Sequence, residues 1–160
     1  MRSHFSARKV TRRSTGITLI ELTLVLVLLG ILAVVALPRL DTRGFDEYAY
    51  AEELRSALRY ARQVAVARNA AVAVPIAGNT FRVCSPVDCS AYLINPGNGR
   101  PWNGSATHQG QAPAGVALTL TTGSSPLVFN SLGGLEPNSD VEIRIGAQII
   151  RIVQDTGHVH

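Results

Sequence analysis

The chain has 160 residues, of which 15 are basic and 11 acidic, and its sequence pI is about 9.6. Five of the basic residues and none of the acidic ones fall within the first 16 positions, which leaves 10 basic against 11 acidic residues in the rest. The high pI therefore reflects one terminal segment and gives no support for a nucleic-acid-binding surface. The remaining length suits one small domain rather than two.

The N-terminal segment, residues 1–16, is basic and contains no acid. Its positive charges would hold this end of the chain in the cytoplasm, because basic residues that flank an apolar segment stay on the cytoplasmic side. The segment ends in Gly16, directly before a long apolar run, and its basic residues are Arg2, Arg8, Lys9, Arg12 and Arg13. We interpret residues 1–16 as a leader peptide.

Residues 17–37 form the apolar run. A helix of about 21 residues is about 31 Å long, the thickness of a bilayer core, so the run predicts a single transmembrane helix. An acidic side chain within such a helix costs about 2.5–3.5 kcal/mol on insertion scales, so Glu21 needs a cation or an interfacial position. The run is interrupted only by Thr18, Glu21, Thr23 and Gly30.

Gly16 and Glu21 resemble the signature of type IV prepilins, in which a basic leader ends in Gly and the fifth residue of the following apolar helix is Glu; Ile17 departs from it, because most members carry Phe there. Cleavage after Gly16 would create an α-amine at Ile17, one helical turn from Glu21. The resemblance, which extends to Pro38, implies that a membrane-embedded aspartyl prepilin peptidase removes the leader and N-methylates Ile17. It also implies that Glu21 pairs with the terminal amine of a neighbouring subunit during assembly.

Two other interpretations explain less of the sequence. Signal peptidase I could cut after Ala36, but the apolar region exceeds the roughly 7–15 residues of a signal-peptide core and begins with an acid. An uncleaved signal anchor would explain the length and the basic flank, but it explains neither Gly16 nor Glu21.

Residues 38–73 predict a continuation of the helix beyond the membrane, with a kink between Pro38 and Gly44. From Asp46 onward, apolar side chains recur at i, i+3 and i+4, which predicts an amphipathic helix with one buried stripe. That stripe contains Leu54, Ala57, Leu58, Ala61, Val64, Ala65 and Val72. Another stripe carries Arg55, Arg59 and Arg62, which we interpret as a solvated face rather than an anion-binding ridge.

Residues 74–160 predict a β-rich head of antiparallel strands, so the expected fold class is α+β. Segments rich in Val, Ile, Thr and Leu predict strands at residues 71–76, 81–84, 116–121, 127–130, 141–145 and 148–153. Gly146-Ala147 separates the last two, which predicts a two-residue type II′ hairpin. Residues 95–115, dense in Gly, Pro, Asn and Ser around Trp102, predict a surface loop that contributes nothing to the core.

Cys84 and Cys89 are the two cysteines of the chain. A head outside the cytoplasmic membrane lies in an oxidising compartment, where such a pair forms a disulfide. As a metal site the pair is two ligands short, so a structural disulfide is favoured over free thiols, a metal site or a redox site.

The remaining candidate residues point to no catalytic chemistry. His158 and His160 lie on one face of an extended tail and could chelate a metal, but only Asp155 stands near them, so a solvated tail is favoured. The sequence holds no nucleophile elbow, phosphate-binding loop, paired catalytic carboxylates or zinc-ligand spacing. We therefore expect neither an enzyme nor a cofactor.

Residues 43–49, 57–65, 128–133 and 152–158 give a second resemblance, to the MshC-type minor pilins of mannose-sensitive haemagglutinin (MSHA) pili, within the GspH/FimT family. Some FimT-like proteins bind DNA through a basic C-terminal motif. Residues 155–160 hold no clustered arginines, so nucleic acid is disfavoured as a partner.

Together the two resemblances imply a minor pilin that primes or assembles a type IV pilus. It would be a single-pass protein of the bacterial inner membrane, with a cytoplasmic N-terminus and a periplasmic head. Its implied partners are prepilin peptidase, other major and minor pilins or pseudopilins, the assembly platform protein and inner-membrane lipid. The alternative is a pseudopilin of a type II secretion system. A DNA-receptor minor pilin and a membrane-anchored enzyme are disfavoured.

Overall fold

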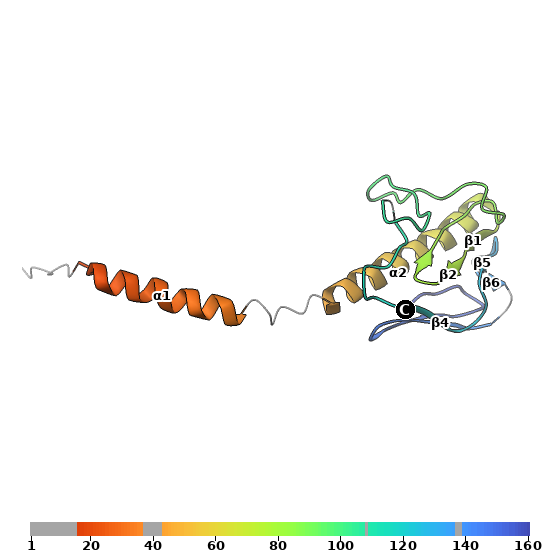
Figure 1. Ribbon diagram of the computed structural model, residues 1–160. Coiled ribbons are helices and arrows are strands. Elements are labelled where there is room, and N and C mark those ends of the chain that lie inside the picture. Colours follow the sequence, from red (N-terminus) through yellow and green to blue (C-terminus); the bar gives the residue numbers. More distant parts are fainter. Residues whose placement is uncertain (1–15, 37–42, 108, 137–138) are drawn as a thin grey trace, which may run out of the picture. The chain divides into compact units, whose positions relative to one another are not determined.

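The computed structural model describes residues 16–36, 43–107, 109–136 and 139–160. The chain divides into two units, Met1–Asp41 and Thr42–His160 (Figure 1). The described part of the first unit is helix α1 (Leu19–Ala36) with the residues that lead into it. The second unit is the head, which contains one long helix, α2 (Arg43–Arg68), and short antiparallel strands.

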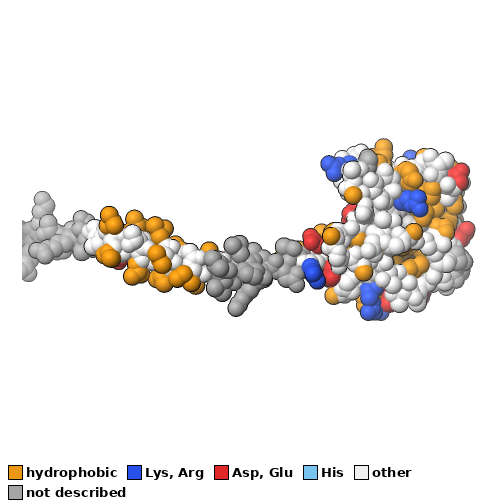
Figure 2. Space-filling model, in the orientation of Figure 1, with side chains coloured by type: hydrophobic (Ala, Val, Ile, Leu, Met, Phe, Trp, Pro, Cys, Tyr) orange, Lys and Arg blue, Asp and Glu red, His pale blue; other side chains and the backbone are white. Residues whose placement is uncertain are grey.

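Helix α1 is apolar on all of its faces. Leu, Val and Ile follow one another without a polar stripe, so this helix lacks the amphipathic pattern of a helix that packs one face on a globular core. The side chains described from Ile17 to Ala33 are all exposed, and Figure 2 shows hydrophobic side chains along the described part of this helix. Across the described ranges, no helix meets both the length and the hydropathy of a membrane-crossing span.

Helix α2 packs its apolar stripe onto the strands of the head. It contacts strands β1, β5, β7 and β8, and the small alanine side chains of the stripe allow a close approach of helix and sheet. The helix ends in a Schellman motif, in which Asn69 has a φ of 49° and the N–H of Ala70 donates to the carbonyl of Ala65 at 3.1 Å. Its buried residues are Tyr50, Ala51, Leu54, Ala57, Leu58, Ala61, Val64 and Ala65.

The described strands form three antiparallel groups. One has the order β1 (Val72–Val74), β5 (Leu127–Phe129) and β6 (Leu135–Glu136). A second is the pair β2 (Ile76–Ala77) and β3 (Thr80–Phe81). The third has the order β4 (Leu118–Thr122), β7 (Val141–Ile145) and β8 (Gln148–Ile152). The expected combination of a helix with antiparallel strands is confirmed.

The hairpin between β7 and β8 has the predicted two-residue loop. Ile145 pairs with Gln148, and Gly146 has a φ of 55°, whereas Ala147 is not among the positive-φ residues of the described chain. A positive φ at the first loop residue alone is the type II′ geometry. The predicted strand over residues 71–76, by contrast, is interrupted at Pro75, which lacks an N–H to donate and accepts from Arg82 through its carbonyl at 3.0 Å.

Residues 95–115 do contribute to the core, which corrects the expectation of a purely superficial loop. The Trp102 side chain is fully buried, and its ring centre lies 5.6 Å from that of Tyr60 on α2. Main-chain hydrogen bonds hold this tryptophan, because its N–H donates to Leu93 and its carbonyl accepts from Val83. One indole supplies enough apolar area to anchor a segment that is otherwise polar.

The C-terminal residues are also more ordered than a solvated tail, which corrects a second expectation. The main chain of His160 exchanges two hydrogen bonds with Arg151 of β8, at 3.0 and 3.2 Å. Val159 pairs with Ile152 and is 3% exposed, so it belongs to the core. Residues 158–160 therefore extend the sheet along the outer edge of β8.

Candidate functional site

Helix α1 begins at an N-cap residue, Thr18. Thr18 precedes the helix, and its Oγ1 accepts the backbone N–H of Glu21 at 3.3 Å. The sequence Thr18-Leu19-Ile20-Glu21 is the pattern in which a glutamate at the third helical position reaches back toward the capping residue. Glu21 is thereby placed in the first turn, where the positive end of the helix dipole favours a carboxylate.

The carboxylate of Glu21 is an isolated charge on an apolar surface. Its side chain is exposed, and among the described residues no basic group forms an ion pair with it. Thr23, the nearest polar side chain on its C-terminal side, uses its hydroxyl to donate to the carbonyl of Ile20 at 2.9 Å. The hydroxyls of α1 thus satisfy their own helix, and Glu21 retains the capacity to bind an external cation.

The residues predicted for processing lie directly before this turn. Ile17 is 76% exposed, and a β-carbon added to Gly16 would meet no atom within 4 Å. Both residues precede α1 and are sterically accessible. Pro38, the predicted kink, lies outside the described residues.

In the head, the stripe of arginines on α2 is not simply solvated. Arg55 forms an ion pair with Glu52, its side chain is 13% exposed, and its Nη2 also donates to the carbonyl of Ile149. Arg59 donates to the carbonyl of Val159, and the side chain of Arg62 packs against Gly133 and Gly157. These arginines join α2 to β8 and the C-terminal segment.

A second group of polar residues on α2 holds the coil of residues 95–115. Glu53 accepts the N–H of Gly110 at 2.9 Å, and the Tyr50 hydroxyl donates to the Gly110 carbonyl at 3.2 Å. Burial raises the pKa of the Glu53 carboxyl, and the hydrogen bond from Gly110 opposes this effect. Burial, followed by the charge of Glu53, also raises the pKa of the Tyr50 hydroxyl.

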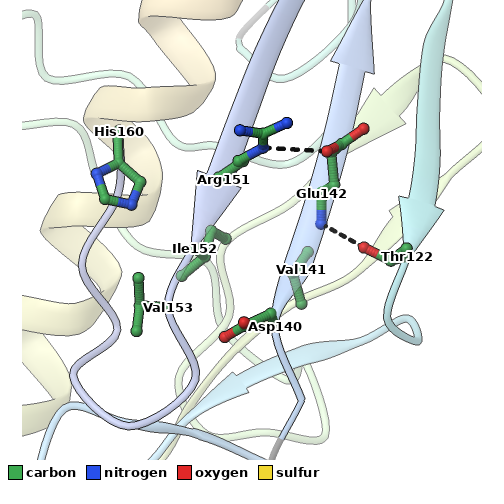
Figure 3. Close-up of a pocket in the computed structure, with 8 residues that line it drawn as sticks. All are labelled: Thr122, Asp140, Val141, Glu142, Arg151, Ile152, Val153 and His160. Carbon is green, nitrogen blue, oxygen red and sulfur yellow. Dashed lines mark hydrogen bonds and ion pairs between the residues drawn. The ribbon is translucent and has the colours of Figure 1, made fainter.

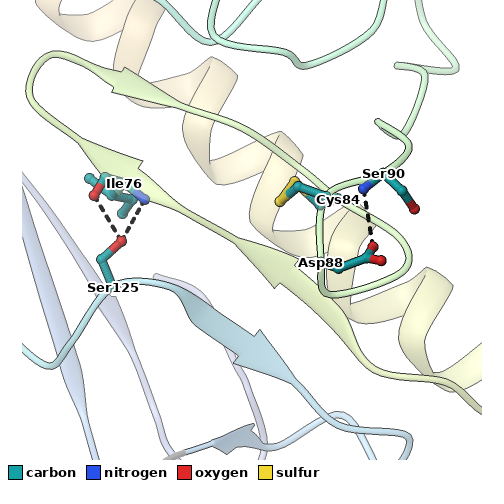
Figure 4. The surroundings of a disulfide bond; sticks show 6 residues. Ile76, Cys84, Asp88, Ser90 and Ser125 are labelled. Carbon is teal, nitrogen blue, oxygen red and sulfur yellow. Dashed lines mark hydrogen bonds between the residues drawn. A yellow bond between two sulfur atoms is a disulfide. The ribbon is translucent and has the colours of Figure 1, made fainter.

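The predicted disulfide is present between Cys84 and Cys89 (Figure 4). Cys84 is fully buried and exchanges two backbone hydrogen bonds with Ala73, so one end of the bridge is fixed beside β1. At the exposed end, Asp88 accepts the N–H of Ser90 at 3.1 Å, which lowers the pKa of the Asp88 carboxyl. The bridge therefore anchors a surface loop to the core.

A shallow hollow of about 220 Å³ lies at the edge of the β4–β7–β8 sheet (Figure 3). Across it, Arg151 forms an ion pair with Glu142 at 3.1 Å, and the N–H of Glu142 donates to Thr122 Oγ1 at 2.9 Å. Asp140 accepts the N–H of Gln154, and His160 borders the same hollow. Within the described ranges, no group of three or more His, Cys, Asp or Glu residues could hold a metal ion.

Several of these contacts were missed from the sequence. The cap that Thr18 provides for Glu21 has a local sequence signature and could have been found from it. The bond that Glu53 accepts and the bond that Arg59 donates could not, because they join residues 57 and 100 positions apart with no pattern between them.

A model of the family described as type II transport protein GspH matches residues 50–157, from the second turn of α2 to the C-terminal segment. This chain belongs to the GspH family. Among solved structures, the GspH-family head resembles the type IV minor pilin FimU of Pseudomonas aeruginosa, with 21% identity and a TM-score of 0.52 over 74% of this chain and 90% of FimU. A second crystal form of FimU gives 20% identity and a TM-score of 0.49 over 71% of this chain and 90% of that one. At this identity the likeness shows a shared fold. A search of curated protein sequences gave no match.

Proposed function

We propose that this GspH-family protein is a minor pilin that is inserted in the inner membrane, processed after Gly16, and assembled through Glu21 into a type IV pilus of the MSHA kind. One observation carries the proposal: α1 is apolar on all faces and exposed, yet it holds a carboxylate in its first turn without a cation among the described residues. Such a helix needs lipid or other helices around it, and such a carboxylate needs a positive partner.

Processing would supply that partner. Cleavage after Gly16 leaves Ile17 as the first residue, and its α-amine would be a cation. Ile17 and Glu21 are one helical turn apart in each subunit. A neighbouring subunit that is shifted by about one turn along the helix axis would therefore place its Glu21 carboxylate beside this amine. The head keeps its own core and disulfide and would remain on the periplasmic side. The partners would be prepilin peptidase, the assembly platform protein, lipid and other pilins, and the role is structural rather than enzymatic.

The processing step is tested by co-expression with a prepilin peptidase and intact-mass measurement. The wild-type chain should lose residues 1–16 and gain one methyl group at Ile17, whereas Gly16→Leu should stay full length. A wild-type chain that keeps Met1, or that is cut after Ala36, contradicts the proposal.

The assembly step is tested with Glu21→Val and Glu21→Gln, expressed with the partner pilins. Both variants should insert and be processed normally but enter sheared filaments at no more than about a tenth of the wild-type level, because both lack the charge. Thr23→Val is the control, since it removes a polar group two residues away on the same helix without removing a charge. Wild-type assembly of the Glu21 variants contradicts the charge-pairing argument.

The family description favours one alternative, a pseudopilin of a type II secretion system. The same processing and the same role for Glu21 would apply, but the machine would export proteins. Deletion in the native bacterium separates the two functions. Loss of surface filaments with normal exoprotein release supports the pilus, and retention of exoproteins in the periplasm supports the secretion system.

A further inference from the structure

The C-terminal segment holds two histidine side chains in a fixed register. His160 lies opposite Arg151 through a pair of backbone hydrogen bonds, and the carbonyl of His158 accepts the N–H of Val153 at 3.0 Å. Val159, between them, is buried against Ile152. Because side chains alternate along an extended segment, burial of Val159 turns both histidines to the opposite, exposed face.

The two imidazole rings lie close together on that face. Their ring centres are 4.8 Å apart, and the planes are 80° to each other. Both side chains are exposed, which leaves the torsion about the Cβ–Cγ bond of each ring free to turn. In an unanchored tail, both the backbone and the two side chains would have to become ordered when a ligand binds. Here the hydrogen bonds to β8 already order the backbone, so only the side chains remain to be ordered.

The ring separation is that of two ligands on one metal ion. An imidazole nitrogen binds Zn²⁺ at about 2.0–2.1 Å and the ring centre lies about 1.1 Å further out, so each ring centre stands about 3.2 Å from the ion. At the bond angles of a tetrahedral site, two such ring centres are about 5 Å apart. The observed 4.8 Å between the ring centres is close to that distance, so rotation of the exposed rings is the movement that a shared ion would require.

We propose that His158 and His160 form a binding site for a divalent ion of the zinc and copper class. Neutral imidazole is a preferred ligand of these ions, and the two remaining positions would be filled by water or by a side chain of a neighbouring subunit. The site adds a function to the head that is independent of Glu21, processing and the type of machine.

The charges around the site permit a cation. Arg151 lies beside His160 on β8, and its positive charge alone would oppose a metal ion. The ion pair between Arg151 and Glu142 offsets that charge, and Asp140 borders the same hollow as His160. Arg59, which donates to the Val159 carbonyl, adds a second positive charge, and Asp140 adds a second negative one, so the charges of these four side chains sum to zero.

The test is a Zn²⁺ titration of the full-length chain in detergent micelles, with isotope-labelled histidine observed by NMR. The chain has four histidines, so His4 and His108 serve as internal controls. The ring signals of His158 and His160 should shift together with one saturation curve, while those of His4 and His108 should not move with it. Equal shifts at all four, or no shift at about 1 mM Zn²⁺, overturn the proposal.

Variants locate the ligands. His158→Ala and His160→Ala should each weaken Zn²⁺ binding by at least about tenfold, since loss even of an outer partner of a ligand costs about 10–100-fold. His108→Ala is the matched control and should leave the affinity unchanged. Both ligand positions are exposed, so circular dichroism should show an unchanged fold. Retention of wild-type affinity in either ligand variant overturns the proposal.

Discussion

At Gly146 the main chain turns with a φ of 55°, and the carboxylate of Glu47 occupies the space that a β-carbon would fill. The same carboxylate accepts the N–H of Ala147 at 3.2 Å, so α2 and the hairpin loop meet at this point. Gly78 has a nearly identical φ of 56°, but a β-carbon there would meet no atom within 4 Å. An alanine at either position would therefore strain the backbone, but only at position 146 would its β-carbon also collide with a neighbouring side chain.

We expect Gly78→Ala to lower the free energy of unfolding by about 1 kcal/mol, the cost of a left-handed alanine. Gly146→Ala should cost about 1 kcal/mol more, because it also displaces Glu47 from the Ala147 amide. Chemical denaturation, followed by the fluorescence of the single tryptophan, measures both. In the Glu47→Ala background the excess cost at Gly146 should vanish. An excess that persists there assigns it to something other than this contact.

Glu53 gives a pH dependence. Its folded-state pKa is raised above the ordinary value of 4.5, so the folded chain holds this proton to a higher pH than the unfolded chain does. The contribution of Glu53 to stability is therefore fully present below pH 4.5 and is lost as the pH rises through the folded pKa. Glu53→Gln keeps an acceptor for Gly110 but cannot ionise. Relative to this variant, the wild type should lose stability as the pH rises above 4.5, measured as the free energy of unfolding at each pH. Parallel curves for the two proteins contradict the assignment.

Among the elements, the loop closed by Cys84 and Cys89 is short, with a sequence separation of five. Chain-entropy arithmetic for such a loop gives about 2 kcal/mol of stabilisation. Cys84→Ala with Cys89→Ala should therefore lower the free energy of unfolding by about 2 kcal/mol and leave the fold intact. Alanine avoids burying a hydroxyl at position 84. Reductant should lower the stability of the wild type by the same amount and leave the variant unchanged, and a wild type whose cysteines are both alkylated without reductant contradicts the bridge.

How well each element could be predicted depends on how local its signal is. In α2 the apolar side chains recur with the period of a helix, and in β7 and β8 they alternate with the period of a strand. Both patterns repeat within a few residues, so the sequence identifies these elements. Strand β6 has two residues, Leu135 and Glu136, and two residues contain no period. It forms because Leu135 and Phe129 pair across a tight turn, which becomes visible only when both strands are placed.

Contacts of the functional residues likewise differ in whether a local sequence pattern predicts them. Thr18 and Glu21 lie within one helical turn, and their pattern is legible in the sequence. The sequence places Trp102 at the surface, because the composition of its neighbours outweighs its own apolar area. The side chain that receives it, Tyr60, is 42 positions away, and composition does not report such a distance.

At the scale of the whole molecule, the head is electrically balanced. The segment Thr42–His160 holds nine basic and nine acidic residues, and Arg55, Arg59 and Arg151 form hydrogen bonds or ion pairs within the head. Non-specific DNA binding depends on cations that are free to neutralise phosphates. The head has its own core and should fold alone as a monomer that does not bind DNA.

Circular dichroism, light scattering and fluorescence anisotropy with labelled duplex at near-physiological salt check this expectation. Binding weaker than about 10 µM supports it. Sub-micromolar binding that falls with salt and is lost in a variant with Arg55, Arg59 and Arg151 changed to Gln would instead support a DNA receptor.

The closure of the core by Val159 has a consequence for the timing of biosynthesis. Helix α2 is complete once Arg68 has been made, yet the residues that cover its stripe continue to Val159, where Arg59 binds the main chain. At about 5–20 residues per second, the ribosome needs roughly 5–20 s to add that interval. During those seconds the nascent helix carries an uncovered apolar stripe, which is a surface that a holding chaperone can bind.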